Sequence, residues 1–202
     1  MTFSLAARCP ETGMFGVAVS SSSPCVAARC AHARAGVGAV LSQNVTDPGL
    51  GTRLLDLMAL GAGATEAVAI VRQTAPHCQY RQLIAVDREG SAAIFSGSEA
   101  LGRCGEARGP GVASGGNLLA DAAIPQIVVD GFLASQGHLG DRLLAAMQAG
   151  VAAGGEAGPI HSAGMMLVRE TPWPVADLRV DWTEGCPVRE LQALWEIYRP
   201  QL

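Results

Sequence analysis

The stretch Thr2-Phe3-Ser4-Leu5-Ala6-Ala7-Arg8 has the alternating pattern of a β-strand at the start of the chain. Its larger apolar side chains occupy every second position and therefore share one face: Phe3, Leu5 and Ala7. The turn-forming run Pro10-Glu11-Thr12-Gly13 follows, and a second apolar segment covers residues 14–20. The chain is therefore predicted to open with a β-hairpin.

Thr2 follows Met1 directly, and this position gives it a chemical option that an internal threonine lacks. If Met1 is removed, Thr2 carries both a hydroxyl and a free α-amine, which is a nucleophile with its own base attached. While Met1 remains, the same nitrogen belongs to an amide and has no useful basicity. The structural alternative is a β-branched residue that simply starts a strand.

The composition predicts one folded domain over residues 1–202. Hydrophobic residues make up 49% of the chain and charged residues 16%, which favours a full core and argues against disorder. No apolar run has the length of a membrane span, and the N-terminus lacks the layout of a secretory signal. We therefore expect a cytoplasmic protein that does not act in a membrane.

The charged residues argue against two classes of partner. All 14 basic residues are arginines, they are scattered, and the net charge is −4, so there is no basic stripe for nucleic acid. The six cysteines and four histidines have no zinc-ligand spacing, and we expect neither a metal nor a cofactor. The apolar, arginine-only composition is compatible with a homodimer.

The rest of the chain alternates between groups of strands and pairs of helices. Further strands are predicted at residues 35–41, 82–86, 92–95, 111–114, 161–168 and 176–180. Helices are predicted at residues 48–61, 65–75, 125–135, 139–150 and 187–199. Residues 26–34 are ambiguous, and the glycine-rich stretch 97–116 is expected to be mostly irregular. Two antiparallel sheets with a helical layer outside each would use all these elements.

Six motifs spread over nearly the whole chain carry a family resemblance: Thr2-Phe3-Ser4, Gly16-Val17-Ala18-Val19, the run from His32 to Val40, Gly115-Gly116-Asn117, Ala153-Gly154-Gly155-Glu156 and Asp177-Leu178-Arg179-Val180-Asp181. With these motifs the chain resembles a bacterial and archaeal family of unknown function within the N-terminal nucleophile (Ntn) hydrolases. The resemblance implies an α+β fold, a four-layer αββα sandwich of two antiparallel sheets flanked by helices. It implies no established reaction.

A looser resemblance to the catalytic subunits of the proteasome implies roles for several positions. Thr2 matches the nucleophile, and Gln43-Asn44 matches the strand exit where a backbone N–H supplies the oxyanion hole. The loop Ser114–Asn117 matches the segment beside the nucleophile's amine, and residues 155–162 match a region with a supporting carboxylate and serine. Those subunits also place a lysine near the nucleophile. This chain has no lysine, and the matching region holds other basic residues: Arg29, His32 and Arg34.

Each candidate side chain also has a structural interpretation. Asn117 after two glycines suits a turn with a left-handed backbone, and Gln43 and Asn44 could cap the helix that follows them. Glu156 in a glycine-rich loop is typical of a solvated acid. The serine run 20–23 is typical of a solvated loop, although Ser20 at the strand end could face the site. The neighbours His161 and Ser162 are a further candidate dyad.

We therefore predict an amidohydrolase that cleaves a small amide or an N-acyl or peptide-like bond. Thr2 would attack the carbonyl while its own amine takes the proton, and Asn44 and Asn117 would donate to the oxyanion. Substrate contacts are assigned to four polar residues: Gln43, Ser20, Glu156 and Ser162. The competing hypothesis is a non-catalytic binding or assembly protein that has the same fold and retains Met1.

Overall fold

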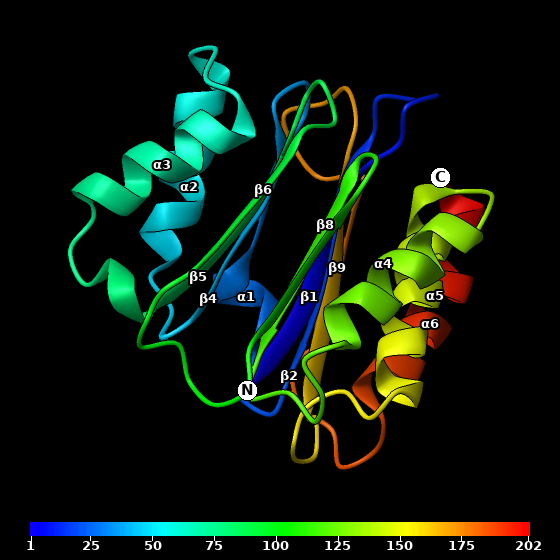
Figure 1. Cartoon of the computed structure of the whole chain (residues 1–202). Coiled ribbons are helices and arrows are strands. Elements are labelled where there is room, and N and C mark those ends of the chain that lie inside the picture. Colours follow the sequence, from blue (N-terminus) through cyan, green and yellow to red (C-terminus); the bar gives the residue numbers. More distant parts are fainter.

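Two antiparallel β-sheets form the middle of the molecule, and helices cover their outer faces (Figure 1). The computed structural model describes residues 1–202. From edge to edge, the six-stranded sheet contains β10 (Ala176–Val180), β9 (Ser162–Val168), β2 (Phe15–Ser21), β1 (Thr2–Arg8), β8 (Val112–Asn117) and β7 (Gly105–Gly109). The four-stranded sheet contains β3 (Ala31–Arg34), β4 (Gly38–Asn44), β5 (Arg81–Asp87) and β6 (Ala92–Ser96).

The helices form the two outer layers of the sandwich. Two of them pack on the four-stranded sheet: α2 (Pro48–Ala59) and α3 (Ala64–Thr74). Three pack on the six-stranded sheet: α4 (Ile124–Ala134), α5 (Leu139–Ala152) and α6 (Pro187–Tyr198). The short segments are α1 (Ala27–Cys30), η1 (Cys78–Tyr80) and η2 (Arg199–Gln201). The predicted α+β fold, a four-layer αββα sandwich, is confirmed (Figure 1).

The first strand lies in the centre of the larger sheet, between β2 and β8. Phe3, Leu5 and Ala7 belong to the apolar cluster under α4, α5 and α6, as their alternation predicts. Ala6 belongs instead to the cluster between the two sheets. Gly150 lets α5 approach β1 closely, because a Cβ atom there would lie 2.9 Å from Phe3 Cε2.

Two expectations differ from the structure, one in the bounds of a strand and one in a strand that was not expected, each for a local reason. The strand predicted at residues 35–41 is β4, which begins only at Gly38 because Gly36 (φ +70°) makes a turn between β3 and β4. The ambiguous residues 26–34 supply α1 and β3. The stretch expected to be irregular contains β7, whose sequence Gly105-Glu-Ala-Arg-Gly109 has almost no apolar alternation because it forms a half-exposed edge strand.

The predicted start of the first long helix is confirmed. Asp47 is the N-cap of α2, its side chain accepts a hydrogen bond of 3.1 Å from the Gly49 N–H, and Pro48 occupies the first turn. None of the helices combines the length and the apolarity that crossing a bilayer requires.

Candidate active site around Thr2

Thr2 is the first residue of the central strand, and it is 6% exposed. In the sheet it lies directly opposite Asn117 of β8. Its hydroxyl donates to the Met1 carbonyl oxygen at 2.5 Å, and its Oγ1 lies 3.4 Å from Ser21 Oγ at the end of β2. The candidate nucleophile is therefore held at a strand end, inside the sandwich, with a second hydroxyl beside it.

A short loop after β2 surrounds this hydroxyl pair. Ser21 Oγ donates to the Met1 carbonyl oxygen at 2.5 Å and lies 2.9 Å from Ser23 Oγ. The Ser23 N–H also donates to Ser21 Oγ at 3.1 Å. Arg29 of α1 holds the loop from outside, with hydrogen bonds to Ser23 Oγ at 2.6 Å and to the Pro24 carbonyl at 2.5 Å. The serine run is therefore an ordered part of the site and not only a solvated loop.

Arg29 is the only one of the three basic residues in the region of the expected lysine that reaches this loop. His32 packs against α2, where a Cβ atom on Gly51 would lie 2.2 Å from His32 Cδ2. Arg34 forms an ion pair of 2.8 Å with Asp56, also on α2. The structure therefore connects the Thr2 hydroxyl to one guanidinium group, through Ser21 and Ser23.

The segment 154–161 crosses the ends of β8, β1 and β2 at the lower edge of the molecule in Figure 1. The Ala120 N–H donates to the Gly155 carbonyl at 3.0 Å, and the Ala157 N–H donates to the Leu118 carbonyl at 2.9 Å. At the other end, the His161 N–H donates to the Ser21 carbonyl at 2.9 Å. Between these anchors, Gly158 lies against the Met1 side chain, since a Cβ there would be 3.1 Å from Met1 Cε.

Glu156 sits in this crossing segment and is 4% exposed, in contrast to the solvated acid that its loop suggests. Its Oε2 accepts a hydrogen bond of 3.1 Å from the Ser22 N–H, and its Oε1 is buried without a partner. Burial raises the pKa of Glu156 to about 7 from an ordinary value of 4.5, against the opposing effects of the terminal amine and the Ser22 hydrogen bond. The carboxyl group is therefore a buried acid beside the chain terminus that titrates near neutral pH.

Ser162 and Ser20 are fully buried and support this arrangement. Ser162 Oγ donates to the Ser23 carbonyl at 2.6 Å and accepts from the Val26 N–H at 3.3 Å, so it fixes both ends of the serine loop. Ser20 pairs with Phe3 in the sheet and therefore faces the helices, and its hydroxyl donates to the Ser162 carbonyl at 3.1 Å. Ser21, which sequence reasoning did not single out, occupies the position that we expected of Ser20.

A second polar cluster lies between the two sheets and includes Gln43. Ser4 Oγ donates to Gln43 Oε1 at 2.7 Å, and Gln43 Nε2 donates to Gln82 Oε1 at 2.7 Å. Asn117 Nδ2 also donates to Gln82 Oε1, at 3.3 Å, and Gln82 Nε2 donates to Ser96 Oγ at 2.8 Å. We call these residues the glutamine layer: Ser4, Gln43, Gln82, Ser96 and Asn117.

Asn44 is separate from this cluster. Its backbone has φ +75°, its Nδ2 donates to the Tyr80 carbonyl at 2.5 Å, and its Oδ1 accepts from the Leu101 N–H at 3.1 Å. The side chain therefore ties two loops to the end of β4. The structure brings Thr2, Asn117 and Gln43 into one connected region and leaves the Asn44 amide engaged elsewhere.

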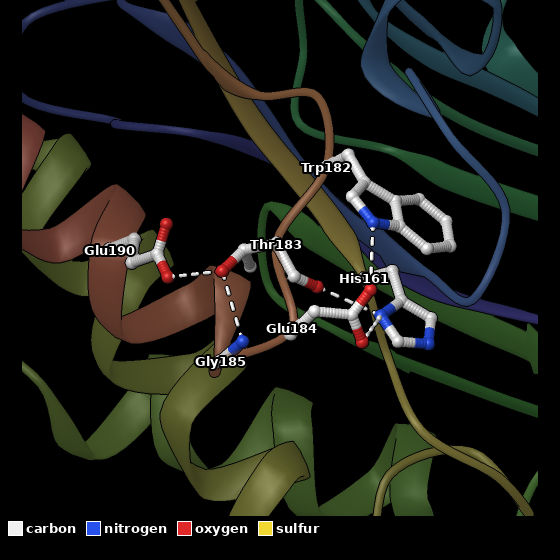
Figure 2. A network of polar contacts seen from close by, with 6 residues as sticks. All are labelled: His161, Trp182, Thr183, Glu184, Gly185 and Glu190. Carbon is white, nitrogen blue, oxygen red and sulfur yellow. Dashed lines mark hydrogen bonds and ion pairs between the residues drawn. The ribbon is translucent and has the colours of Figure 1, made fainter.

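His161 and Ser162 do not form a dyad, because each has another partner. His161 Nδ1 lies 2.8 Å from the Thr183 carbonyl oxygen, and its ring stacks on Trp182 with centroids 4.2 Å apart (Figure 2). Glu184 links the two rings, since it accepts from Trp182 Nε1 at 3.1 Å and lies 3.9 Å from His161 Nδ1 (Figure 2). Trp182 is nevertheless 51% exposed. It lies in the loop that follows β10, which bonds to His161 just before the start of β9.

The ionisable side chains do not gather elsewhere into a ligand set. No group of three or more histidine, cysteine, aspartate or glutamate residues is placed to hold a metal ion. All six cysteines are free thiols. The chemistry that the site offers is therefore that of hydroxyls, one buried carboxyl group and, if Met1 is absent, a terminal amine.

Comparisons with known proteins agree with the layered architecture. The model of the family described as "Family of unknown function (DUF1028)" matches residues 2–191. The crystal structure of protein SPO2555 from Silicibacter pomeroyi, which carries the same family designation, is 31% identical with a TM-score of 0.90, over 97% of this chain and 88% of that one.

Two structures of Anbu proteins are more distant. The Anbu (Gly-1) mutant from Hyphomicrobium sp. strain MC1 is 11% identical with a TM-score of 0.47, over 100% of this chain and 96% of that one. Anbu (ancestral beta-subunit) from Yersinia bercovieri is 12% identical with a TM-score of 0.43, over 98% and 95%. No curated protein matches the chain.

Proposed function

The chain belongs to the DUF1028 family, whose function is unknown, and we propose that it is an amide hydrolase of the Ntn type with Thr2 as its nucleophile. The observation that carries the proposal is the setting of Thr2: a buried hydroxyl on the second residue, beside Ser21 and close to a buried carboxyl group. The substrate class that fits such a nucleophile is a small amide or an N-acyl or peptide-like compound.

The reaction requires the terminal amine of Thr2, and therefore the loss of Met1. The Thr2 Oγ attacks the substrate carbonyl carbon, and the hydroxyl proton passes to the α-amine, directly or through a water molecule. When the tetrahedral intermediate collapses, the C–N bond breaks and that proton leaves on the amine product. A water molecule, deprotonated by the same α-amine, then hydrolyses the acyl ester and restores the hydroxyl.

We assign Asn117 as the oxyanion donor because it lies directly opposite Thr2 in the sheet and its Nδ2 is held in place by Gln82. The side chain of Asn44 receives no such role, since its amide bonds to the loops at Tyr80 and Leu101 and not to the residues around Thr2. Gln43, Ser20 and Ser162 are fully buried, so we assign them to positioning rather than to direct substrate contact. Glu156, beside the terminus, would set the charge around the amine.

The test compares Met1-free protein with its Thr2→Ala variant. An N-terminal fusion, cut so that Thr2 becomes the first residue, gives both proteins in the same way. A β-lactone probe that acylates nucleophiles should add one acyl group to the Thr2 protein, measured as intact mass, and none to Thr2→Ala. Thr2→Ser should retain labelling, because it keeps the hydroxyl. An unlabelled Thr2 protein, or equal labelling of Thr2→Ala, would overturn the proposal.

One observation favours the competing function, a non-catalytic binding or assembly protein that keeps Met1. The Met1 carbonyl accepts hydrogen bonds from both Thr2 and Ser21, and the Met1 side chain packs against Gly158. The intact mass of protein purified from its native host distinguishes the two functions. Quantitative retention of Met1 would support the non-catalytic function, and its loss would support the hydrolase.

A further inference from the structure

A continuous row of polar groups connects the surface of the molecule to the Thr2 hydroxyl. Arg29 Nη2 donates to Ser23 Oγ at 2.6 Å, Ser23 Oγ lies 2.9 Å from Ser21 Oγ, and Ser21 Oγ lies 3.4 Å from Thr2 Oγ1. A guanidinium group stands at one end of this row and the candidate nucleophile at the other. We call these four residues the serine relay: Arg29, Ser23, Ser21 and Thr2.

The direction of the hydrogen bonds in the serine relay follows from counting protons. A guanidinium group can only donate, so Ser23 Oγ accepts from Arg29. Ser21 has one hydroxyl proton, and it donates this proton to the Met1 carbonyl at 2.5 Å. The contact between the two serines must therefore use the Ser23 proton. Every donor in the relay points from Arg29 towards the chain terminus.

Removal of Met1 would leave the Ser21 proton without its acceptor. Ser21 Oγ already accepts hydrogen bonds from the Ser23 hydroxyl and from the Ser23 N–H. Its own hydroxyl proton is therefore directed away from Ser23, towards the chain terminus. The neighbouring hydroxyl oxygen is Thr2 Oγ1 at 3.4 Å. Thr2 Oγ1 would then accept from Ser21 while its own proton is directed to the α-amine, which is the arrangement that an attacking hydroxyl needs.

The loop that carries the relay is fixed independently of Thr2. Arg29 Nη1 donates to the Pro24 carbonyl, and Ser162 Oγ connects the Ser23 carbonyl to the Val26 N–H. Arg29 therefore acts through a preorganised set of hydroxyls, whose orientation costs little at the moment of reaction.

We propose that Arg29 is a positioning residue for Thr2, which orients the hydroxyls of Ser23 and Ser21 and through them stabilises negative charge that develops on Thr2 Oγ1. The inference rests on the proposed function, because it concerns the reactivity of the same hydroxyl. A hydrogen bond that begins on a cation is stronger than one between neutral groups, and its effect passes along a chain of hydroxyls. The proposal assigns the cationic role at this site to an arginine in a chain that contains no lysine.

Other ionisable groups face the same terminus and must be separated from Arg29 in any measurement. Burial raises the pKa of Glu156 and of the Cys30 thiol, and the positive terminal amine, which in this structure belongs to Met1, acts in the opposite direction on both. The negative form of Glu156 favours a protonated amine, whereas Arg29 disfavours it. Loss of Arg29 should therefore shift the rising limb of the pH profile for labelling to higher pH. Loss of Glu156 should shift it to lower pH.

The experiment measures the rate of β-lactone labelling of Met1-free protein from pH 5 to 9. Arg29→Gln should reduce the rate about tenfold, which corresponds to about 1.4 kcal/mol, and should shift the limb to higher pH. Arg29→Lys should recover most of the rate, since it restores a cationic donor. Arg34→Gln is the matched control, because it removes an arginine that contacts α2 and not the relay.

A double-mutant cycle tests whether Arg29 acts through the serines. Ser23→Ala should lower the rate as much as Arg29→Gln, and the double variant should be no slower than either single variant. If the loss of rate in the double variant equals the product of the two single losses, the inference is overturned. An Arg29→Gln rate equal to that of wild type would also overturn it. If the wild-type Met1-free protein is labelled at Thr2 in those cases, the proposed function stands and only the relay fails. Thermal unfolding of each variant identifies losses that come from misfolding.

Discussion

The glutamine layer and the serine relay are both polar clusters inside the sandwich, but their hydrogen bonds are completed in different ways. In the glutamine layer, the amides of Gln43 and Gln82 bond to each other, to neighbouring hydroxyls and to backbone carbonyls. At the relay, Ser21 and Thr2 both depend on the carbonyl of Met1, and the nearby Glu156 Oε1 has no partner. A buried network whose hydrogen bonds are all made stabilises a fold. An incomplete network marks a place where a change in protonation, in charge or in bound ligand alters which hydrogen bonds are made.

The largest effect on labelling is expected from Thr2→Ala in the Met1-free protein, and this variant tests the difference between the two clusters most directly. We expect labelling by the β-lactone to fall at least about a hundredfold, because no other hydroxyl there carries an adjacent amine. The free energy of unfolding should change by only about 1 kcal/mol, since the lost groups are a methyl and one hydroxyl. A loss of stability without a loss of labelling would place Thr2 among the structural residues.

Gln82→Ala should instead have its main effect on stability, and it should affect labelling only through Asn117, whose Nδ2 it holds. Its removal leaves Gln43 Nε2, Asn117 Nδ2 and Ser96 Oγ without their shared partner in a buried space. We expect the free energy of unfolding to fall by about 3 kcal/mol, measured by urea denaturation. Ser96→Ala, which removes one hydrogen bond at the margin of the layer, is the matched control and should cost about 1 kcal/mol. Equal effects would show that the layer does not act as a unit.

Glu156→Gln should change how stability depends on pH. The pKa of Glu156 is raised in the folded state to about 7 from 4.5, so its contribution is most favourable below pH 4.5 and is lost as the pH rises through 7. At pH 8 the glutamine variant should therefore be more stable than wild type by about 3 kcal/mol, and at pH 4.5 the difference should nearly vanish. Urea denaturation at the two pH values measures this, and a constant difference would contradict a buried titrating acid.

The smallest effect is expected at an ion pair outside both clusters. Arg34 and Asp56 lie 2.8 Å apart, with side chains 39% and 57% exposed. Solvent screens such a pair, so Asp56→Asn should lower the free energy of unfolding by about 0.5 kcal/mol and leave labelling unchanged. A larger loss would mean that charge at the surface, and not the completeness of buried networks, controls stability in this protein.

The fold was predictable from local patterns where those patterns have a single physical cause. The alternation from Phe3 to Ala7 predicts a strand with one apolar face, and that face lies under the helices. Asp47-Pro48 predicts the start of a helix, which the structure confirms. The edge strand β7 was missed because Gly105–Gly109 buries only one of its side chains and therefore lacks the apolar pattern of a central strand.

The candidate site was less predictable, because its contacts join residues that are distant in the chain. Thr2 and Asn117 were selected from the sequence, and they are direct partners in the sheet. Gln82 was missed because a single polar residue at the start of an apolar strand gives no sign of the partner it meets 39 residues away. Arg29 and Ser21 depend on how one loop folds over the chain terminus, which no local pattern specifies.

The central place of β1 has a consequence for biosynthesis. Thr2 pairs with Asn117, so the ribosome must add about 115 residues before that neighbour of the first strand exists. At about 5–20 residues per second, this interval lasts roughly 6–23 seconds. Once the N-terminus has left the ribosomal exit tunnel, the first peptide bond is accessible to a processing aminopeptidase for the rest of this interval, and the folding of β8 and of the segment 154–161 beside Met1 then restricts that access. Whether Met1 is removed would then depend on the rate of processing relative to the rate of translation, before folding is complete.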